Sequence, residues 1–237
     1  MSSTATALNF DQQLAVTDLA QRFEFIANSI KNTTFTTSLG KEDQLITHVI
    51  ASGSHNISVA AINTGRLFPQ TIALIETTQQ KYKIDIAEYH PDEVETKKYA
   101  DSFGLNGFYE SIKARHECCR VRKLEPLEKI LKNTDGWITG LRREQSNNRA
   151  HVPFCEWSEK YQVFKFNPLA DLSTDAMDSF IAEHDVPINP LHFKGFPSIG
   201  CEPCTRAIKP GEDERAGRWW WENDNSRECG LHQSRSI

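Results

Sequence analysis

The chain has 237 residues, of which 38% are hydrophobic, and it carries a formal net charge of −5 at pH 7. This length fits one α/β domain with a small appendage, and the negative charge argues against general adhesion to nucleic acid. No apolar run approaches the roughly 18 residues of a transmembrane helix, and residues 1–10 lack the regions of a secretory signal. We therefore expect a cytoplasmic protein, in which patterned cysteines indicate metal or redox chemistry.

The predicted elements alternate along the chain. Apolar residues at helical spacing predict an amphipathic helix over residues 11–30. Beyond it, the expected strands cover residues 33–39, 57–62, 83–89 and 137–141, and the expected helices cover residues 42–51, 69–80 and 173–184. This alternation predicts an α/β fold with a mostly parallel, twisted sheet that is flanked by helices. From residue 205 on the chain is mostly polar, and we expect Trp219-Trp220-Trp221 to pin this tail to the domain.

Three loops that follow predicted strands combine small residues with a cation. Ligands bind at the carboxyl ends of parallel strands, where glycine admits a close backbone approach and the next helix presents its positive N-terminus. The loops therefore predict a site for a phosphate or sulfate ester, although each loop alone is also explained by a plain turn. A solvated loop is the alternative for Arg142 and Arg143. The loops are Ser38-Leu39-Gly40-Lys41, Asn63-Thr64-Gly65-Arg66 and Gly140-Leu141-Arg142-Arg143.

Four of the six cysteines form two pairs, Cys118-Cys119 and Cys201-Glu202-Pro203-Cys204. A CxxC turn brings two thiolates onto one centre. Adjacent cysteines diverge, by about 100° on a helix, so that both reach the same centre only if it is large. A cubane iron–sulfur cluster meets this condition better than a single zinc ion. Thiolates are also favoured by the basic residues beside the tandem pair, Arg120, Arg122 and Lys123.

Other interpretations of the cysteines remain open on spacing alone. The same four residues could hold a structural zinc ion, and the CxxC pair could form a catalytic disulfide. Inert buried cysteines are the general alternative. Cys155 has no partner at ligand spacing, and we interpret it as structural. Cys229 lies in a polar tail next to Arg227 and His232, which can activate it, although a solvent-exposed bystander is the alternative.

The motifs, taken in order, resemble the assimilatory adenylyl-sulfate (APS) reductases of bacteria and plants, within the larger family of phosphoadenylyl-sulfate (PAPS) reductases. The resemblance runs from about Thr36 to His232. Reductases specific for PAPS generally lack the four paired cysteines, so the resemblance points towards APS. The chain departs from the family at Asn63 and Gln70, where the family usually has Asp and Glu. The matching segments are Ser38–Asp43, Asn63–Pro69, Cys118–Lys123, Thr139–Ser146, Gly200–Thr205, Arg215–Glu222 and Glu228–His232.

The resemblance implies an adenine-nucleotide α-hydrolase-like fold with a mobile C-terminal segment. It also implies a [4Fe–4S] cluster whose ligands are Cys118, Cys119, Cys201 and Cys204, and it makes Cys229 the nucleophile. We accordingly divide the chain into three parts: an N-terminal helical segment, residues 1–30; an α/β domain that binds nucleotide and cluster, residues 31–205; and a C-terminal segment that carries the catalytic cysteine, residues 206–237.

The implied reaction is the thiol-dependent reduction of APS to sulfite and AMP in sulfate assimilation. Cys229 attacks the sulfur of APS and becomes an S-sulfocysteine, from which thioredoxin or glutaredoxin releases sulfite. Arginine suits the phosphosulfate group because its planar fork binds such oxygens bidentately. No nucleic-acid or membrane partner is expected, and a homo-oligomer is left open. By motif position, the expected substrate-binding residues are Ser38, Gly40, Thr64, Gly65, Arg66, Lys123, Gly140, Arg149, Arg215, Arg218 and His232.

Three other functions compete with APS reduction. The first is the reduction of PAPS, or of both substrates. The second is an ATP-pyrophosphatase-type nucleotide enzyme, which the fold alone would allow; such enzymes normally carry an SGGxDS-like loop, whose second glycine and final serine are absent from Ser38–Asp43. The third is a non-enzymatic zinc or iron–sulfur binding protein, which would leave Cys229, Arg215 and Arg218 without a role.

Overall fold

The computed structural model describes residues 2–222, which form two compact units. Unit 1 contains the residues up to Ala61 together with Gln70–Ala87 and Ile130–Asn189. Unit 2 contains Ile62–Pro69, Glu88–Lys129 and the described residues from Pro190 onward. Residues 223–237, which include Cys229 and His232, lie outside the described residues; they belong to the segment expected to be mobile. The three-part division expected from the sequence stays a prediction.

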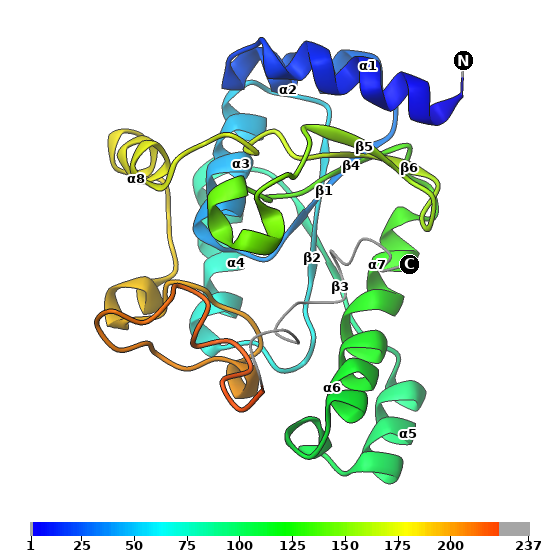
Figure 1. Ribbon diagram of the computed structural model, residues 1–237, viewed down its shortest axis with the longest axis vertical. Helices are drawn as coiled ribbons and strands as arrows, with labels where there is room; N and C mark the ends of the chain where they lie inside the picture. The colour runs from blue at the N-terminus through cyan, green and yellow to red at the C-terminus, as the bar shows by residue number, and fades with distance from the viewer. Residues whose placement is uncertain (1, 223–237) are drawn as a thin grey trace. The chain divides into compact units, whose positions relative to one another are not determined.

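A six-stranded sheet in the order β3-β2-β1-β4-β6-β5 forms the framework (Figure 1). β1 pairs in parallel with β2 and with β4, and β4 pairs in parallel with β6; only the edge strand β5 is recorded as antiparallel, to β6. The predicted mostly parallel sheet is thus confirmed. The strands are β1 Thr33–Thr37, β2 Ser58–Ile62, β3 Ile86–Tyr89, β4 Gly136–Ile138, β5 Cys155–Ser158 and β6 Val163–Phe166.

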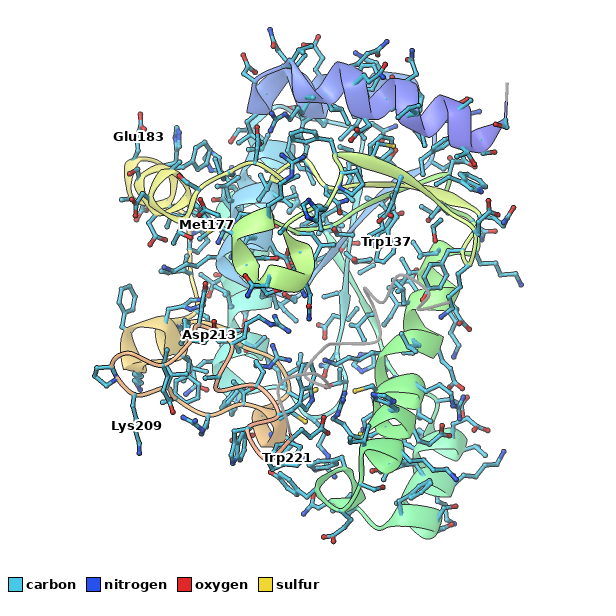
Figure 2. The ribbon with its side chains drawn as sticks, viewed as in Figure 1. Trp137, Met177, Glu183, Lys209, Asp213 and Trp221 are labelled. Atoms are coloured by element: carbon cyan, nitrogen blue, oxygen red, sulfur yellow. The ribbon has the colours of Figure 1, made fainter. Side chains whose placement is uncertain are left out.

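Helices connect and flank these strands, as the alternation predicted. In unit 1, α1 packs on β5, and α3 packs on α8, from which Figure 2 shows Met177 turned inward. These two contacts bury apolar side chains on both helices: Leu14 of α1 and Met177 of α8 are at most 2% exposed. The helices are α1 Ser3–Ala15, α2 Leu19–Ser29, α3 Lys41–Ser52, α4 Pro69–Tyr82, α5 Glu93–Phe103, α6 Ile112–Cys119, α7 Glu125–Leu131 and α8 Thr174–Glu183.

The single helix expected over residues 11–30 is wrong, because two helices cover this stretch. Asp18 caps α2 in a reciprocal capping box with Gln21, which satisfies two N–H groups at a new helix start. Just before it, the Thr17 hydroxyl donates to the Leu14 carbonyl at the end of α1. The apolar spacing continues across this junction, so periodicity alone did not reveal it.

The core of unit 1 is aliphatic and aromatic. Side chains from α1, α2 and the central strands meet in one cluster, and Leu14, Phe23, Phe35, Ile138 and Phe166 are fully buried in it. Burial of such side chains supplies the main favourable term in folding. Within residues 2–222, no helix is both long and apolar enough to cross a membrane.

Candidate functional site

Unit 2 holds the two cysteine pairs on short, irregular elements. The tandem pair ends α6, and the chain continues in a π-helical turn, Arg120–Leu124. Such turns are frequent at functional sites because they re-aim the side chains around them. The CxxC pair lies on a 3-10 turn, Glu202–Cys204, with Cys201 at its start and Pro203 inside it.

All four thiols line one cavity of unit 2, so the structure brings together the ligand set that the sequence predicted. Cys119, Cys201 and Cys204 are buried and Cys118 is half-buried. No disulfide joins any of the five described cysteines. The remaining lining residues are four cations, Arg66, Arg115, Arg122 and Lys123, and three apolar side chains, Phe108, Pro203 and Trp219.

The loop Asn63–Arg66 is bonded to both cysteine segments. The Thr64 hydroxyl lies 3.3 Å from Cys201 Sγ, and the Thr64 carbonyl accepts a bond of 2.8 Å from Arg122 Nη1. Glu202 N donates to the Arg66 carbonyl, also over 2.8 Å. Gly65 has a φ of +69°, which glycine adopts without strain. The loop that was predicted to touch the nucleotide therefore also fixes the geometry of the thiols.

Asn63, one of the two departures from the family pattern, uses its amide in this loop. Its Oδ1 accepts from Gly65 N at 3.2 Å, and its Nδ2 donates to Glu88 Oε2 at 3.1 Å. An aspartate could make the first bond but not the second, since an ionised carboxylate only accepts. The amide thus supports the loop through a contact with β3 that the usual acid would turn into a repulsion.

Burial and nearby cations act on the thiols in opposite directions. Burial raises the pKa of Cys118, while Arg122 acts to lower it. Burial, followed by the effect of Cys201, raises the pKa of Cys204 to about 12, against the smaller effects of Lys123 and Arg218. Without a bound cation these two thiols stay protonated at pH 7. A metal would reverse this balance, because coordination deprotonates a thiol outright.

A buried donor without an acceptor lies in the wall of this cavity. Trp219 lines the cavity, and its indole Nε1 is buried and has no hydrogen-bond partner. Burial raises the pKa of Tyr99 to about 12, and the neighbouring thiol of Cys118 adds to this. Unmet buried donors are costly, and sulfur atoms bound in the cavity would be their natural acceptors.

The donor set fits an iron–sulfur cluster better than one metal ion. Among residues 2–222, no three or more His, Cys, Asp and Glu side chains are grouped so that they could hold a single ion. The four thiols instead line the wall of a shared cavity, and a [4Fe–4S] cluster takes one thiolate on each of four irons. Unit 2 could therefore hold the cluster with Cys118, Cys119, Cys201 and Cys204.

Cations that were predicted to bind the phosphosulfate group lie near the thiols of unit 2. Lys123 lines the cavity, and Arg218 is buried with its guanidinium over the Trp219 ring, 4.8 Å from the centroid. Arg218 Nη1 donates to Ser198 Oγ at 3.3 Å, but its buried Nε has no partner. Arg215 is half-buried three residues earlier. Arg66 bonds to Asn106 and to the Leu105 carbonyl.

The other predicted contacts lie in unit 1, on the loops that follow β1 and β4. Ser38 is exposed and Gly40 begins α3, while Gly140 follows β4. Arg149 is buried, with Nη1 bonded to Gln145 Oε1. The solvated-loop alternative is wrong for Arg142, because this side chain is fully buried and pairs with Glu42 at 2.9 Å.

Two features of the sites had little or no sequence signal. Asp43, inside the motif that follows β1, is buried and bonded to Ser38. Arg115 and Glu222 form a fully buried ion pair in unit 2, 107 residues apart, and the Arg115 guanidinium lies over Trp219. The only sequence signal for this pair was the position of Glu222 at the end of a matching segment. Cys155 lies in β5, buried in the core of unit 1, which supports its structural interpretation.

The chain is similar to known proteins over nearly its whole length. The family described as Phosphoadenosine phosphosulfate reductase domain matches residues 32–207. An adenosine 5'-phosphosulfate reductase of Agrobacterium fabrum is 52% identical over 98% of this chain and 89% of that protein. One from Rhizobium meliloti is 54% identical over 94% of this chain and 84% of that protein. One from Burkholderia cepacia is 44% identical over 98% and 92%, respectively.

Solved structures support the expected fold. A phosphoadenylyl-sulfate reductase from Candida auris, in a phosphate complex, aligns with a TM-score of 0.75 and 22% identity, over 88% of this chain and 98% of that one. An FMN adenylyltransferase from Candida glabrata, in complex with FAD and pyrophosphate, aligns with a TM-score of 0.56 and 16% identity, over 96% and 80%. At these identities the likeness concerns the fold alone, and it confirms the predicted α/β nucleotide-binding type.

Proposed function

The chain belongs to the phosphoadenosine phosphosulfate reductase domain family, and from this premise we propose that it reduces APS to sulfite and AMP in sulfate assimilation. The observation that carries the proposal is the convergence of four thiols from two distant segments on one cation-lined cavity. The relatives at 52–54% identity are also named adenosine 5'-phosphosulfate reductases. A pyrophosphatase would have no use for these four thiols, and a passive metal-binding protein would leave Cys229, Arg215 and Arg218 without a role.

We propose that Cys118, Cys119, Cys201 and Cys204 hold a [4Fe–4S] cluster. Bound there, the cluster would present a fixed, charged sulfur surface beside Lys123 and Arg122. The chain's own part is to position that surface: the π-turn aims the tandem pair, and Thr64 with Arg122 ties the CxxC segment to it. The electrons of the reaction come from thiols, so no step needs a change in the oxidation state of the cluster.

The proposed substrate-binding residues divide according to the charge they offer. Ser38, Gly40, Thr64, Gly65 and Gly140 offer backbone N–H groups and hydroxyls to the nucleotide. Lys123, Arg149, Arg215 and Arg218 offer positive charge to the phosphosulfate group, whose anionic oxygens would otherwise repel a thiolate. Arg66 and His232 are the remaining proposed contacts of the substrate. The unpaired Nε of Arg218 is a donor available for such an oxygen.

The proposed first step is nucleophilic. The thiolate of Cys229 attacks the sulfur of APS, an S–S bond forms, and the bond from sulfur to the bridging oxygen breaks. AMP leaves with the electron pair of the broken bond, and the enzyme carries an S-sulfocysteine. Neutralisation of the phosphosulfate charge by the arginines lowers the barrier to this encounter of two anions.

The proposed second step supplies the two electrons. A thiolate of thioredoxin or glutaredoxin attacks Sγ of Cys229, the S–S bond breaks, and sulfite departs with the bonding pair. The second thiol of the donor then resolves the mixed disulfide and restores the Cys229 thiol. This chemistry needs reduced thiols, which is why we also propose a cytoplasmic location.

The test detects the transfer of sulfite from APS to the protein. Wild-type protein, purified anaerobically and incubated with APS without a thiol donor, is expected to gain one sulfite mass on the peptide that contains Cys229. Cys229→Ser is expected to gain none and to lose thioredoxin-dependent turnover, since a hydroxyl is a far weaker nucleophile. Cys155→Ser is the matched control, because Cys155 lies buried in unit 1, and it should form the adduct normally. An adduct on Cys229→Ser would contradict the nucleophile assignment.

Rate measurements distinguish the second candidate function, the reduction of PAPS, from the reduction of APS. Turnover with APS and with PAPS is measured in parallel, and we expect the kcat/KM for APS to be higher. The four thiols in one cavity favour APS, because reductases specific for PAPS generally lack them. Iron and acid-labile sulfide are determined on the same samples, and about four of each per chain are expected for one cubane cluster. Zinc in place of iron and sulfide would contradict the proposed cluster.

A further inference from the structure

Asp43 is a buried carboxylate with an unusual position. It lies in the first turn of α3, directly after the loop Ser38–Lys41, and its side chain turns back onto that loop. Its Oδ2 accepts hydrogen bonds from both the N–H and the hydroxyl of Ser38, the latter over 2.7 Å. Only 7% of Asp43 is exposed. One carboxylate oxygen therefore fixes the residue at which the chain leaves β1.

The other carboxylate oxygen faces the loop after β4. A Cβ built on Gly140 would overlap Asp43 Oδ1 more closely than real Cβ atoms ever approach another atom, and would lie 3.1 Å from Glu42 Cβ. The Gly140 carbonyl in turn accepts from Gln145 Nε2 at 3.1 Å, and Gln145 Oε1 accepts from Arg149. Two strand-end loops of unit 1 thus meet at the same carboxyl group.

The loop that Asp43 holds is strained. Leu39 has a φ of +63°, a conformation that costs a non-glycine residue about 1 kcal/mol or more. Its N–H donates to Thr37 Oγ1, and Gly40 begins α3 without any side-chain cap. The bonds from Ser38 to Asp43 offset the strain on one side of Leu39. The uncapped N–H groups of α3 stay open on the other side, where an anion would be favoured.

The negative charge of Asp43 reduces the stability of the folded protein. Burial raises the pKa of Asp43 to about 6, and the negative charge of Glu42 adds to this, against the bonds from Ser38 and the positive charge of Arg149. Glu42 is itself paired with Arg142, so its effect is partly screened. A raised pKa means that the folded state prefers the protonated acid, so the ionised form found at pH 7 reduces stability. Costs of this kind are characteristic of functional positions.

We propose that Asp43 is the positioning residue of the nucleotide-binding loops: its carboxylate holds Ser38 in place and requires glycine at position 140. The inference rests on the proposed function, since it assigns Asp43 to the adenylyl part of that substrate. Asp43 lies inside the matching motif Ser38–Asp43, but it was not among the expected binding residues. The ionised carboxylate is the stronger acceptor for the two bonds from Ser38, so ionisation couples to nucleotide binding.

The test uses AMP as the probe, the full-length protein, and calorimetric titration at several pH values. At pH 8 we expect Asp43→Ala to weaken AMP binding at least tenfold, and Gly140→Ala to weaken it similarly, because the added methyl would push the carboxylate away. Asp178→Ala is the matched control: Asp178 also bonds to this loop, through Lys41 over 2.8 Å, but its side chain is 48% exposed. It should bind AMP as the wild type does.

Asp43→Asn separates charge from shape. The phosphate of AMP titrates near the same pH, so the informative quantity is the ratio of the two affinities, wild type over Asp43→Asn. We expect this ratio to be largest above pH 7 and to approach one below pH 5, where the wild-type acid is also neutral. We further expect Asp43→Asn to unfold at no lower temperature than the wild type at pH 8, because it removes a buried charge.

The outcomes are distinct. Equal AMP affinity for wild type and Asp43→Ala, or a ratio that does not change with pH, would overturn the inference and leave the proposed function standing. A lower unfolding temperature for Asp43→Asn with unchanged AMP affinity would make Asp43 a merely structural residue, which also overturns it. A wild-type protein that binds no AMP at any pH would overturn the proposed function itself, and this inference with it.

Discussion

The two units of the molecule are built around different interiors. Unit 1 has a large cluster of aliphatic and aromatic side chains on a six-stranded sheet. One buried cluster of unit 2 has four members, Phe108, Cys201, Cys204 and Trp219, with Cys118 and Trp221 packed against them. Cysteines thus supply half of this cluster. We therefore expect the packing around it to depend on what the thiols bind, whereas the cluster of unit 1 depends on apolar burial.

Buried polar atoms without a hydrogen-bond partner occur in both units, but they differ in kind. In unit 1 they include the acceptors Gln44 Oε1 and Gln70 Oε1, while other buried polar side chains find partners, as Asn167 does with Thr139 and the Pro153 carbonyl. In unit 2 they include the donors Trp219 Nε1 and Arg218 Nε. An interior with unmet donors is incomplete until a ligand supplies acceptors. The comparison therefore predicts that metal removal weakens unit 2 and leaves unit 1 intact.

Cys201→Ser is expected to affect unit 2 strongly and unit 1 hardly at all. Cys201 belongs to the buried cluster and bonds to Thr64, so its loss removes a proposed ligand and a core contact together. We expect iron and acid-labile sulfide to fall at least about tenfold and catalysis to be lost, since an altered ligand costs more than the 10–100-fold typical of supporting residues. Hydrogen exchange is expected to speed up in α6 and to stay unchanged in β1.

The matched control for this prediction is Cys155→Ser. It changes one sulfur to oxygen in the core of unit 1, where no ligand role is proposed. Iron content should equal that of the wild type, and any loss of stability should appear in unit 1. Equal iron content in Cys201→Ser and in the wild type would contradict both the ligand set and the dependence of unit 2 on it.

The buried ion pair of unit 2 provides the next largest effect. Arg115 donates from Nε and Nη2 to the two carboxylate oxygens of Glu222, the second bond at 2.9 Å, and the side chains are 1% and 4% exposed. In Glu222→Gln a buried guanidinium loses its counter-charge, which typically costs about 3–5 kcal/mol. We expect the free energy of opening in α6, measured by hydrogen exchange, to fall by about this amount.

A surface pair of the same unit is the control for Glu222→Gln. Arg206 and Glu212 form a two-bond pair at 2.8 and 3.0 Å, but their side chains are 33% and 30% exposed. Glu212→Gln should leave the exchange of α6 unchanged, because exposed pairs contribute little. If Glu212→Gln and Glu222→Gln had equal effects, burial would not be the reason for the importance of the Arg115–Glu222 pair.

The sequence predicted unit 1 well and unit 2 poorly, for a physical reason. Strands and helices of unit 1 bury regular stripes, as β1 does with Thr33, Phe35 and Thr37, and such periodicity is readable. The three helices α5, α6 and α7 carry mixed surfaces and a π-turn, so residues 93–131 gave no clear period. In unit 1 the exceptions are the paired strands β5 and β6, which were missed.

The meeting of the four cysteines was predictable because their spacing is typical of a shared centre, whereas the supporting contacts were not predictable. Thr64 reaches Cys201 across 137 residues, and Arg115 reaches Glu222 across 107. No local pattern encodes such pairings, which exist only once the chain has folded. Asp43 illustrates the same limit: its partner Ser38 is five residues away, but its contact with Gly140 depends on strands β1 and β4 lying side by side.

The smallest predicted effect concerns unit 1 and its dependence on pH. Arg22 is buried and holds Asp171 through two bonds, at 2.6 and 2.9 Å, and this hydrogen bonding lowers the pKa of Asp171 below its ordinary value. A lowered carboxyl pKa contributes stability above pH 3.8, and that stability is lost as the pH falls through the folded-state pKa. Asp171→Asn is therefore expected to lower the free energy of unfolding by only roughly 1 kcal/mol at pH 7, because the carboxylate is partly exposed.

Urea unfolding at pH 7, 5 and 3 measures this gap in the free energy of unfolding between the wild type and Asp171→Asn. The gap should be unchanged between pH 7 and pH 5 and reduced at pH 3. Asp185→Asn, at an exposed partner of Lys81, should show no gap at any pH. A gap for Asp171→Asn that persisted undiminished at the lowest pH would mean that Arg22 binds the neutral acid as well as the carboxylate, and that the charge of Asp171 does not stabilise unit 1.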